Sequence, residues 1–236
     1  MRNTIVTAAA LCLAGCATAE MDGFAEVAAK SELVNIEGVG WGRSGNFTLS
    51  PLGVAGKFRR SAGSSTVNGD KLSQGRVVFD LIGDGEFGGL QAECAHSRET
   101  FETSERVSRR ATFGTSTLIG PYVMTCGFFR GADDIGGIEV REEQGGTFDG
   151  RTLRSGHADV GDAKMRLASI HAIPGIEMPS GPPMGYAMDF AGGGEAMLHS
   201  NGSTQQIALP PAGRDERTAA LLSGIALALV WDPGDD

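Results

Sequence analysis

The chain has 236 residues and a formal net charge of −9 at pH 7, which is long enough for one domain with a substantial core. The acidic balance argues against a nucleic-acid partner, because proteins that bind nucleic acid present basic surfaces. The chain contains 36 glycines, and aromatic residues make up only 6% of it. Between short apolar runs, so much glycine favours tight turns in an antiparallel β protein.

The N-terminus has the features of a secretory signal. Arg2 supplies a positive charge, residues 5–14 are apolar except for Thr7, and small residues follow. The apolar run is too short to cross a bilayer, which needs about 20 residues.

The segment Leu13-Ala14-Gly15-Cys16 resembles the lipobox of bacterial lipoproteins. This resemblance implies cleavage before Cys16, diacylation of its thiol and acylation of the new amino group. Two acyl chains anchor a protein stably where one does not. In this family an aspartate after the cysteine favours the inner membrane; Ala17 here implies the outer membrane, with the protein facing the periplasm. The alternative is an ordinary cleaved signal with a chance cysteine.

We therefore expect a signal peptide at 1–15, a lipidated tether at 16–32 and a single β-rich domain at 33–236. Removing residues 1–15 loses one charge, Arg2, and leaves 19 basic against 29 acidic residues (19 − 29 = −10). So acidic a chain offers no polybasic patch to anionic lipid, and the acyl chains must attach the protein to the membrane.

The remaining cysteines form a lone pair. Cys12 leaves with the signal and Cys16 carries lipid, so Cys94 and Cys126 are left in an oxidising compartment, where a disulfide is the default. Two free buried thiols are the alternative. The pair has no histidine spacing typical of a metal site, and we predict neither a metal nor a cofactor.

Short segments with period-2 alternation begin near residue 33. Leu90, Ala92 and Cys94 share one strand face, and Met124 and Cys126 share another, so both cysteines lie on apolar faces. The expected strands are 47–50, 54–60, 76–82, 89–96, 107–113, 121–129, 137–142, 164–171, 185–190, 195–200 and 205–209.

A helix is expected at 215–231. Asp215 is a good N-cap, Glu216 suits the first turn, and Pro233 and Gly234 end the segment. Residues 218–231 carry no charge and are apolar on every side, so the helix must be buried on every side. The predicted fold is α+β and mostly antiparallel β, with a barrel or strongly curved sheet around the helix as the first choice. A sandwich with the helix at one end is the second.

This plan resembles tubby-like and phospholipid-scramblase-like proteins, in which a barrel encloses an apolar C-terminal helix. The resemblance covers the arrangement alone and carries over no functional residue, and a shared fold says little about function.

Other motifs favour structural roles. Residues 83–88 match G-x-G-x-x-G, but Asp84 and Glu86 would repel phosphates, so we predict a hairpin turn. Asp133 and Asp134 would offer oxygen ligands to Ca²⁺ but lack the spacing of a calcium loop. No catalytic pattern joins the four histidines, His96, His157, His171 and His199, and no nucleophile elbow occurs.

One local basic group stands out in this acidic chain. Its functional interpretation is a docking face for an anionic glycan, lipid headgroup or protein; the alternative is the solvated face of two strands. The group comprises Lys57, Arg59, Arg60, Arg106, Arg109 and Arg110.

Three functions remain open. The first is a non-catalytic envelope lipoprotein that binds a protein partner or supports an envelope assembly. The second is a carrier or sensor of a small apolar ligand or lipid, which would need space that the helix is expected to fill. The third is a hydrolase with dispersed catalytic residues.

Overall fold

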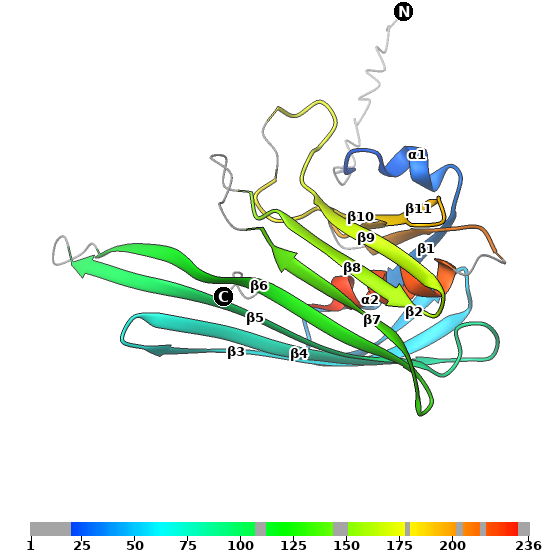
Figure 1. Ribbon diagram of the computed structural model, residues 1–236, viewed down its shortest axis with the longest axis horizontal. Helices are drawn as coiled ribbons and strands as arrows, with labels where there is room; N and C mark the ends of the chain where they lie inside the picture. The colour runs from blue at the N-terminus through cyan, green and yellow to red at the C-terminus, as the bar shows by residue number, and fades with distance from the viewer. Residues whose placement is uncertain are drawn as a thin grey trace, which may run out of the picture.

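The computed structural model describes residues 20–106, 112–143, 151–177, 180–201, 205–212 and 216–230. Its strands form one antiparallel sheet that closes into a twelve-stranded barrel in the order β1-β12-β11-β10-β9-β8-β7-β6-β5-β4-β3-β2 (Figure 1). Each strand pairs with its neighbours in the chain, and β1 closes the ring against β12, where Val34 lies opposite Ile207. The sheet prediction is thus confirmed, and the sheet is a barrel.

The elements follow in chain order. They are α1 (Phe24–Ala28), β1 (Glu32–Glu37), β2 (Ser44–Ser50), β3 (Val54–Val67), β4 (Asp70–Ile82), β5 (Leu90–Arg106), β6 (Thr112–Arg130), β7 (Asp133–Glu142), β8 (Arg154–Val160), β9 (Ala163–Ile170), β10 (Gly185–Phe190), β11 (Glu195–His199), β12 (Gln205–Leu209) and α2 (Glu216–Leu229).

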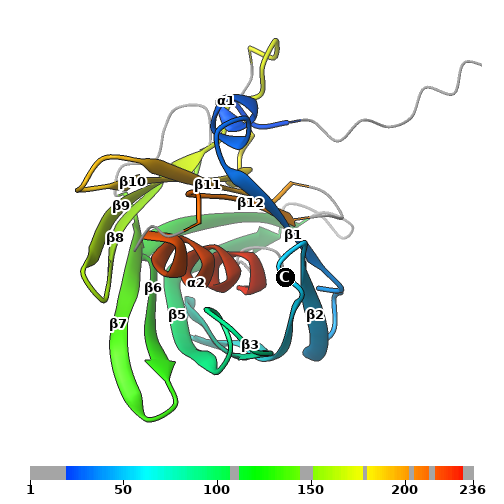
Figure 2. The same cartoon turned by 90° about the vertical axis from the view of Figure 1, so that its right-hand side faces the viewer.

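Helix α2 lies inside the barrel, and the strands surround it (Figure 2). Leu221, Leu222, Ile225 and Leu229 are fully buried, and they pack with inward-facing residues of the strands in one apolar core. The helix is buried on every side because it carries no polar stripe, as the sequence predicted. Among the described residues, neither helix is both long and apolar enough to cross a membrane.

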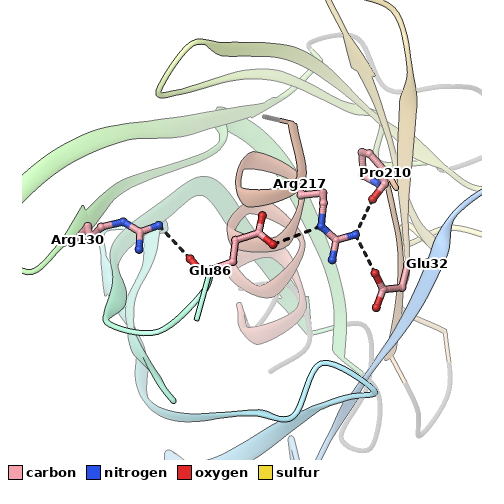
Figure 3. Close-up of polar contacts among 5 residues, drawn as sticks. All are labelled: Glu32, Glu86, Arg130, Pro210 and Arg217. Carbon is pink, nitrogen blue, oxygen red and sulfur yellow. Dashed lines mark hydrogen bonds and ion pairs between the residues drawn. The ribbon is translucent and has the colours of Figure 1, made fainter. Parts of the chain in front are cut away.

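A buried arginine fixes the start of α2. Arg217 lies in the first turn, where a cation meets the positive end of the helix dipole. Its Nη1 donates to the carbonyl oxygen of Pro210 at 2.7 Å and lies 2.9 Å from a carboxylate oxygen of Glu32 (Figure 3). Its Nε lies 3.7 Å from a carboxylate oxygen of Glu86, and the guanidinium sits over the Phe87 ring at 5.6 Å. These partners offset the unfavourable dipole.

The connection between β4 and β5 closes this end of the barrel. It contains the G-x-G-x-x-G segment, and the predicted hairpin turn there is confirmed. Phe87 is buried, Arg130 donates to the carbonyl oxygen of Glu86 at 3.1 Å, and the Glu86 side chain pairs with Arg217. The motif therefore holds the helix in the barrel.

Two strands were missed in the sequence, and several expected bounds were wrong. Strand β3 continues past the expected end at 60 to Val67, β4 begins at Asp70 and not at 76, and β5 continues past 96 to Arg106. The missed strands are β1 and β8. The structure joins 112–113 and 121–129 in one strand, β6, while residues 107–111 lie outside the described part. Proline lacks a ladder donor, and Pro121 falls where the register between β5 and β6 shifts. Pro121 thus interrupts the ladder without ending the strand.

The folded region begins earlier than residue 33. Met21, Phe24 and Val27 are buried against Met197 and Ala208 on the outside of the barrel. Any free tether after Cys16 is therefore shorter than the predicted 16–32. Helix α2 runs from Glu216 to Leu229, in agreement with the expected segment; Asp215 and the final residues lie outside the described part.

The predicted disulfide is present. Cys94 on β5 lies directly opposite Cys126 on β6, and the bond closes a separation of 32 residues. Both cysteines face the interior, as the alternation predicted.

Candidate functional site

The predicted basic group does not form one surface. Lys57 and Arg59 are exposed on the outer face of β3. Arg60, the next residue, points into the barrel and is buried, so its assignment to an exposed docking patch was wrong. The side chain of Arg106 and residues 109 and 110 lie outside the described part of the chain.

Arg60 has a structural role at the end of α2. Its Nη1 donates to the carbonyl oxygen of Leu229 at 3.2 Å, its Nε donates to that of Gly42 at 3.0 Å, and its Nη2 donates to that of Gly40. A cation is favourable at the C-terminus of a helix, where unpaired carbonyls gather. Burial lowers the pKa of Arg60. One guanidinium thus joins β3, the β1–β2 loop and α2.

The outer face of β2, β3 and β4 carries a shallow hollow of about 400 Å³ beside the two exposed cations. Lys57 is paired in register with Asp80, and Arg59 lies between Ser44 on β2 and Val78 on β4. Among the described residues, this hollow contains the part of the predicted basic group that remains on the surface.

A larger hollow of about 670 Å³ continues along the same outer face across β3, β4, β5 and β6. It is lined by small and polar residues, among them Ser61, Ser65, Gln74, Ser97 and Thr125. The two hollows follow one another along β3, because Ser61 is the next outward-facing residue after Arg59. We call them together the outer groove.

Arg76 adds a third cation to the outer groove. It pairs in register with Ser61 and is exposed. Sequence reasoning missed it, although the alternation of Val77, Phe79 and Leu81 toward the core puts residue 76 on the outer face. The groove therefore combines three cations and the carboxylate of Asp80 with hydroxyl and amide groups, a net positive lining suited to hydrogen bonding and to anionic groups of a partner.

A second polar cluster lies inside the barrel wall. The guanidinium of Arg154 stacks on the Tyr122 ring at 4.1 Å, and its Nη1 donates to the hydroxyl oxygen of Tyr186 at 3.5 Å. Glu142 accepts from the backbone N–H of Tyr122 at 3.1 Å and from Arg98 at 3.2 Å. These bonds join β5, β6, β7, β8 and β10, and they satisfy buried polar groups where the apolar core ends.

His171 and Ser169 belong to this inner cluster and are joined by a hydrogen bond. His171 Nδ1 lies 3.0 Å from the carbonyl oxygen of Ser180, which only accepts, so Nδ1 carries the hydrogen. Nε2 therefore accepts from Ser169 Oγ at 3.0 Å, and that oxygen accepts from the backbone N–H of Arg154 at 2.8 Å. The imidazole is oriented by a carbonyl and not by a carboxylate, unlike the histidine of a serine hydrolase triad.

The electrostatics of His171 fit this structural role. Burial lowers its pKa, a hydrogen bond to Ser180 opposes the change, and the nearby charges of Arg151 and Arg154 lower the pKa further. Burial therefore favours the neutral imidazole, which is compatible with both of its hydrogen bonds.

The other three histidines lie apart from one another, and His96 borders the inner cluster through Tyr122. His96 is buried beside the Tyr122 ring, His199 is buried beside Phe24, and His157 is exposed on β8. Among the described residues, no three His, Cys, Asp or Glu side chains gather where a metal ion could bind. Asp134 accepts from the backbone N–H of Gly136 at 2.9 Å at the start of β7.

No family model, curated protein or solved structure matches this chain. The site must therefore be interpreted from its own geometry.

Proposed function

We propose that this protein is a non-catalytic lipoprotein of the bacterial envelope, anchored through Cys16 in the outer membrane and facing the periplasm. Its barrel binds a protein partner at the outer groove. The observation that carries the proposal is that α2 occupies the barrel interior, while the hollows of the described surface lie on the outer wall.

The filled interior argues against the alternative function, a carrier of an apolar ligand. A carrier of this kind binds its ligand in an apolar cavity of several hundred Å³. Here the space inside the strands is taken by buried leucines, isoleucine and alanines of α2. The outer groove is lined instead by small and polar residues at the surface, with Ala95 and Val123 among them, and its polar groups suit the rim of a protein interface.

The chain contains a matched control for the charges of the groove. Lys57 and Arg59 are exposed two residues apart on β3. Lys164 and Arg166 have the same spacing and exposure on β9, where they line a separate hollow of about 370 Å³. Strand β9 lies six strands from β3 in the ring of twelve, on the opposite wall. The substitutions Lys57→Gln/Arg59→Gln and Lys164→Gln/Arg166→Gln therefore remove equal charge from opposite faces.

The test uses a photo-crosslinking amino acid at Gln74, in the groove, or at Arg166, on the opposite wall, in the lipidated protein in its own envelope. We expect a defined protein adduct from position 74 and not from 166. Lys57→Gln/Arg59→Gln should weaken affinity for that partner roughly tenfold at low salt, since exposed charge pairs contribute about 0.2–1 kcal/mol each. The effect should shrink as salt rises.

The control pair should bind as the unaltered protein does. Cys16→Ser should lose the adduct in the envelope while the isolated domain keeps its affinity. Equal adducts from both positions, or equal weakening by both charge pairs, would contradict a partner site at the groove.

A further inference from the structure

The folded chain begins on the outside of the barrel, over β11 and β12. Phe24 stacks beside His199 with ring centroids 5.2 Å apart, and Met21 and Val27 are buried in a small apolar cluster with Met197 and Ala208. Figure 2 shows α1 lying outside the wall formed by β10, β11 and β12. The N-terminal segment is therefore fixed to one wall of the barrel.

The chain between the proposed lipid and this wall is short. Cys16 precedes Met21 by five residues. A fully extended chain spans at most about 3.6 Å per residue, so the Cα atoms of Cys16 and Met21 are at most about 18 Å apart. Acyl chains on Cys16 would keep this wall close to the lipid surface, whatever conformation the connecting residues adopt.

An apolar tip lies next to the same wall. Residues 173–176 form a tight turn in which Pro174 is followed by Gly175 at φ 77°, and Ile176 N–H donates to the carbonyl oxygen of Ile173 at 3.0 Å. Proline and then a positive-φ glycine are the central residues of a type II turn. Ile173 packs toward the small cluster, whereas Ile176 points outward and is 52% exposed.

The turn is joined directly to the N-terminal segment. The backbone N–H of Asp22 donates to the carbonyl oxygen of Ala172 at 3.0 Å. The exposed Ile176 therefore lies on a defined turn, beside the residues that connect the folded domain to the proposed anchor. A protein anchored there would have the apolar interior of the membrane leaflet within reach of this side chain.

We propose that the barrel lies with its β10–β12 wall against the membrane leaflet, with Ile176 inserted at the interface. This inference rests on the proposed lipid anchor at Cys16. In the ring of twelve strands, β11 lies opposite β5 and β12 lies opposite β6. The outer groove, which runs over β2 to β6, then faces away from the membrane toward partners in the periplasm.

The charges beside the turn indicate which lipid headgroup charge this wall would favour. Asp22, Glu26 and Glu177 are exposed near the anchor, and Lys30 is the exposed cation of the same N-terminal segment. Carboxylates are repelled by an anionic surface. The wall therefore fits a zwitterionic leaflet, such as one of phosphatidylethanolamine, better than an anionic one.

The test measures depth in vesicles of phosphatidylethanolamine and phosphatidylcholine that contain nitroxide-labelled lipid. Ile176→Cys and Gln74→Cys are each labelled with a fluorophore in the full lipidated protein, where Cys16 is acylated and Cys94 is bonded to Cys126. Lys30→Cys provides a second position near α1. We expect the label at 176 to be quenched several times more than that at 74, with the label at 30 in between.

Replacing a third of the lipid with phosphatidylglycerol should reduce quenching at 176. Incorporation of labelled palmitate, with Cys16→Ser as its control, separates the two proposals. Palmitate incorporation with equal quenching at 176 and 74 would overturn the orientation while leaving the anchor in place. Absence of incorporation would overturn both.

Discussion

The barrel has two unlike regions, a closed part built of short strands and an arm built of long ones. Strands β1, β2 and β7 to β12 have 5–10 residues, whereas β3, β4, β5 and β6 have 13–19 and extend beyond the rest of the barrel (Figure 1). The closed part surrounds α2. The arm runs past the helix, so its outer half has no core to cover.

Burial along the long strands marks where one region ends. In β3 the inward positions are buried from Val54 to Arg60, and from Ser61 onward the residues are exposed or only half-buried. In β4 burial begins at Ser73, which pairs with Ser64, three residues past that point on β3. The inner cluster of Tyr122, Glu142 and Arg154 lies near the same boundary. The comparison shows that the core fixes the closed part, and that the arm is held mainly by its ladder of hydrogen bonds.

The largest expected difference is in the loss of stability when one leucine of each region is replaced by alanine. Leu222→Ala, in fully buried α2, should lower the free energy of unfolding by about 2–5 kcal/mol. Leu72→Ala, on the arm at 38% exposure, should cost no more than about 0.5 kcal/mol. Urea unfolding measures both. Equal losses would mean that the arm has a core of its own.

The disulfide tests how the two regions are joined. Cys94 and Cys126 bond β5 to β6 on the barrel side of the boundary. Cys94→Ala/Cys126→Ala should cost about 3–4 kcal/mol in the chain-entropy model, given the separation of 32 residues. The unaltered protein in reductant should show a similar loss. A loss under about 1 kcal/mol would show that the ladder alone holds the base of the arm.

The smallest expected effect is a pH dependence confined to the closed part. Burial lowers the folded pKa of His171, so the unfolded chain binds more protons between the two pKa values. The stability that this residue contributes should therefore fall as pH drops through the ordinary histidine range near about 6.5, and level off below the folded pKa. His171→Gln should flatten this part of the profile of melting temperature against pH. An unchanged profile would show that His171 is not the source of this pH dependence.

Much of the fold follows from the alternation in the sequence, and the failures have physical causes. The uncharged run at 218–231 predicts a helix buried on all sides, which a closed sheet satisfies. Strand β8 was missed because its inner positions include Arg154, Gly156 and Ala158. They do not give the regular apolar face of the other strands, and Arg154 lies in the inner polar cluster.

The candidate site was harder to predict than the fold. Arg60 shares the face of Val54 and Phe58, so strict alternation predicts that it points inward; grouping it with its basic neighbours concealed this. The role of Glu86 was also hidden, because its partner Arg217 is 131 positions away in the chain (217 − 86 = 131). Local pattern gives the face of a residue, but only the closed barrel brings together groups so far apart.

The position of α2 in the chain has a consequence for how the protein is made. The element that fills the barrel follows all twelve strands in chain order. A chain that emerges N-terminus first therefore presents every strand before the apolar segment that they must enclose. The wall cannot close around its core before that segment is available, and complete folding has to wait for the helix. Until then the apolar inner faces of the strands are exposed to water, where a chaperone would find a binding surface.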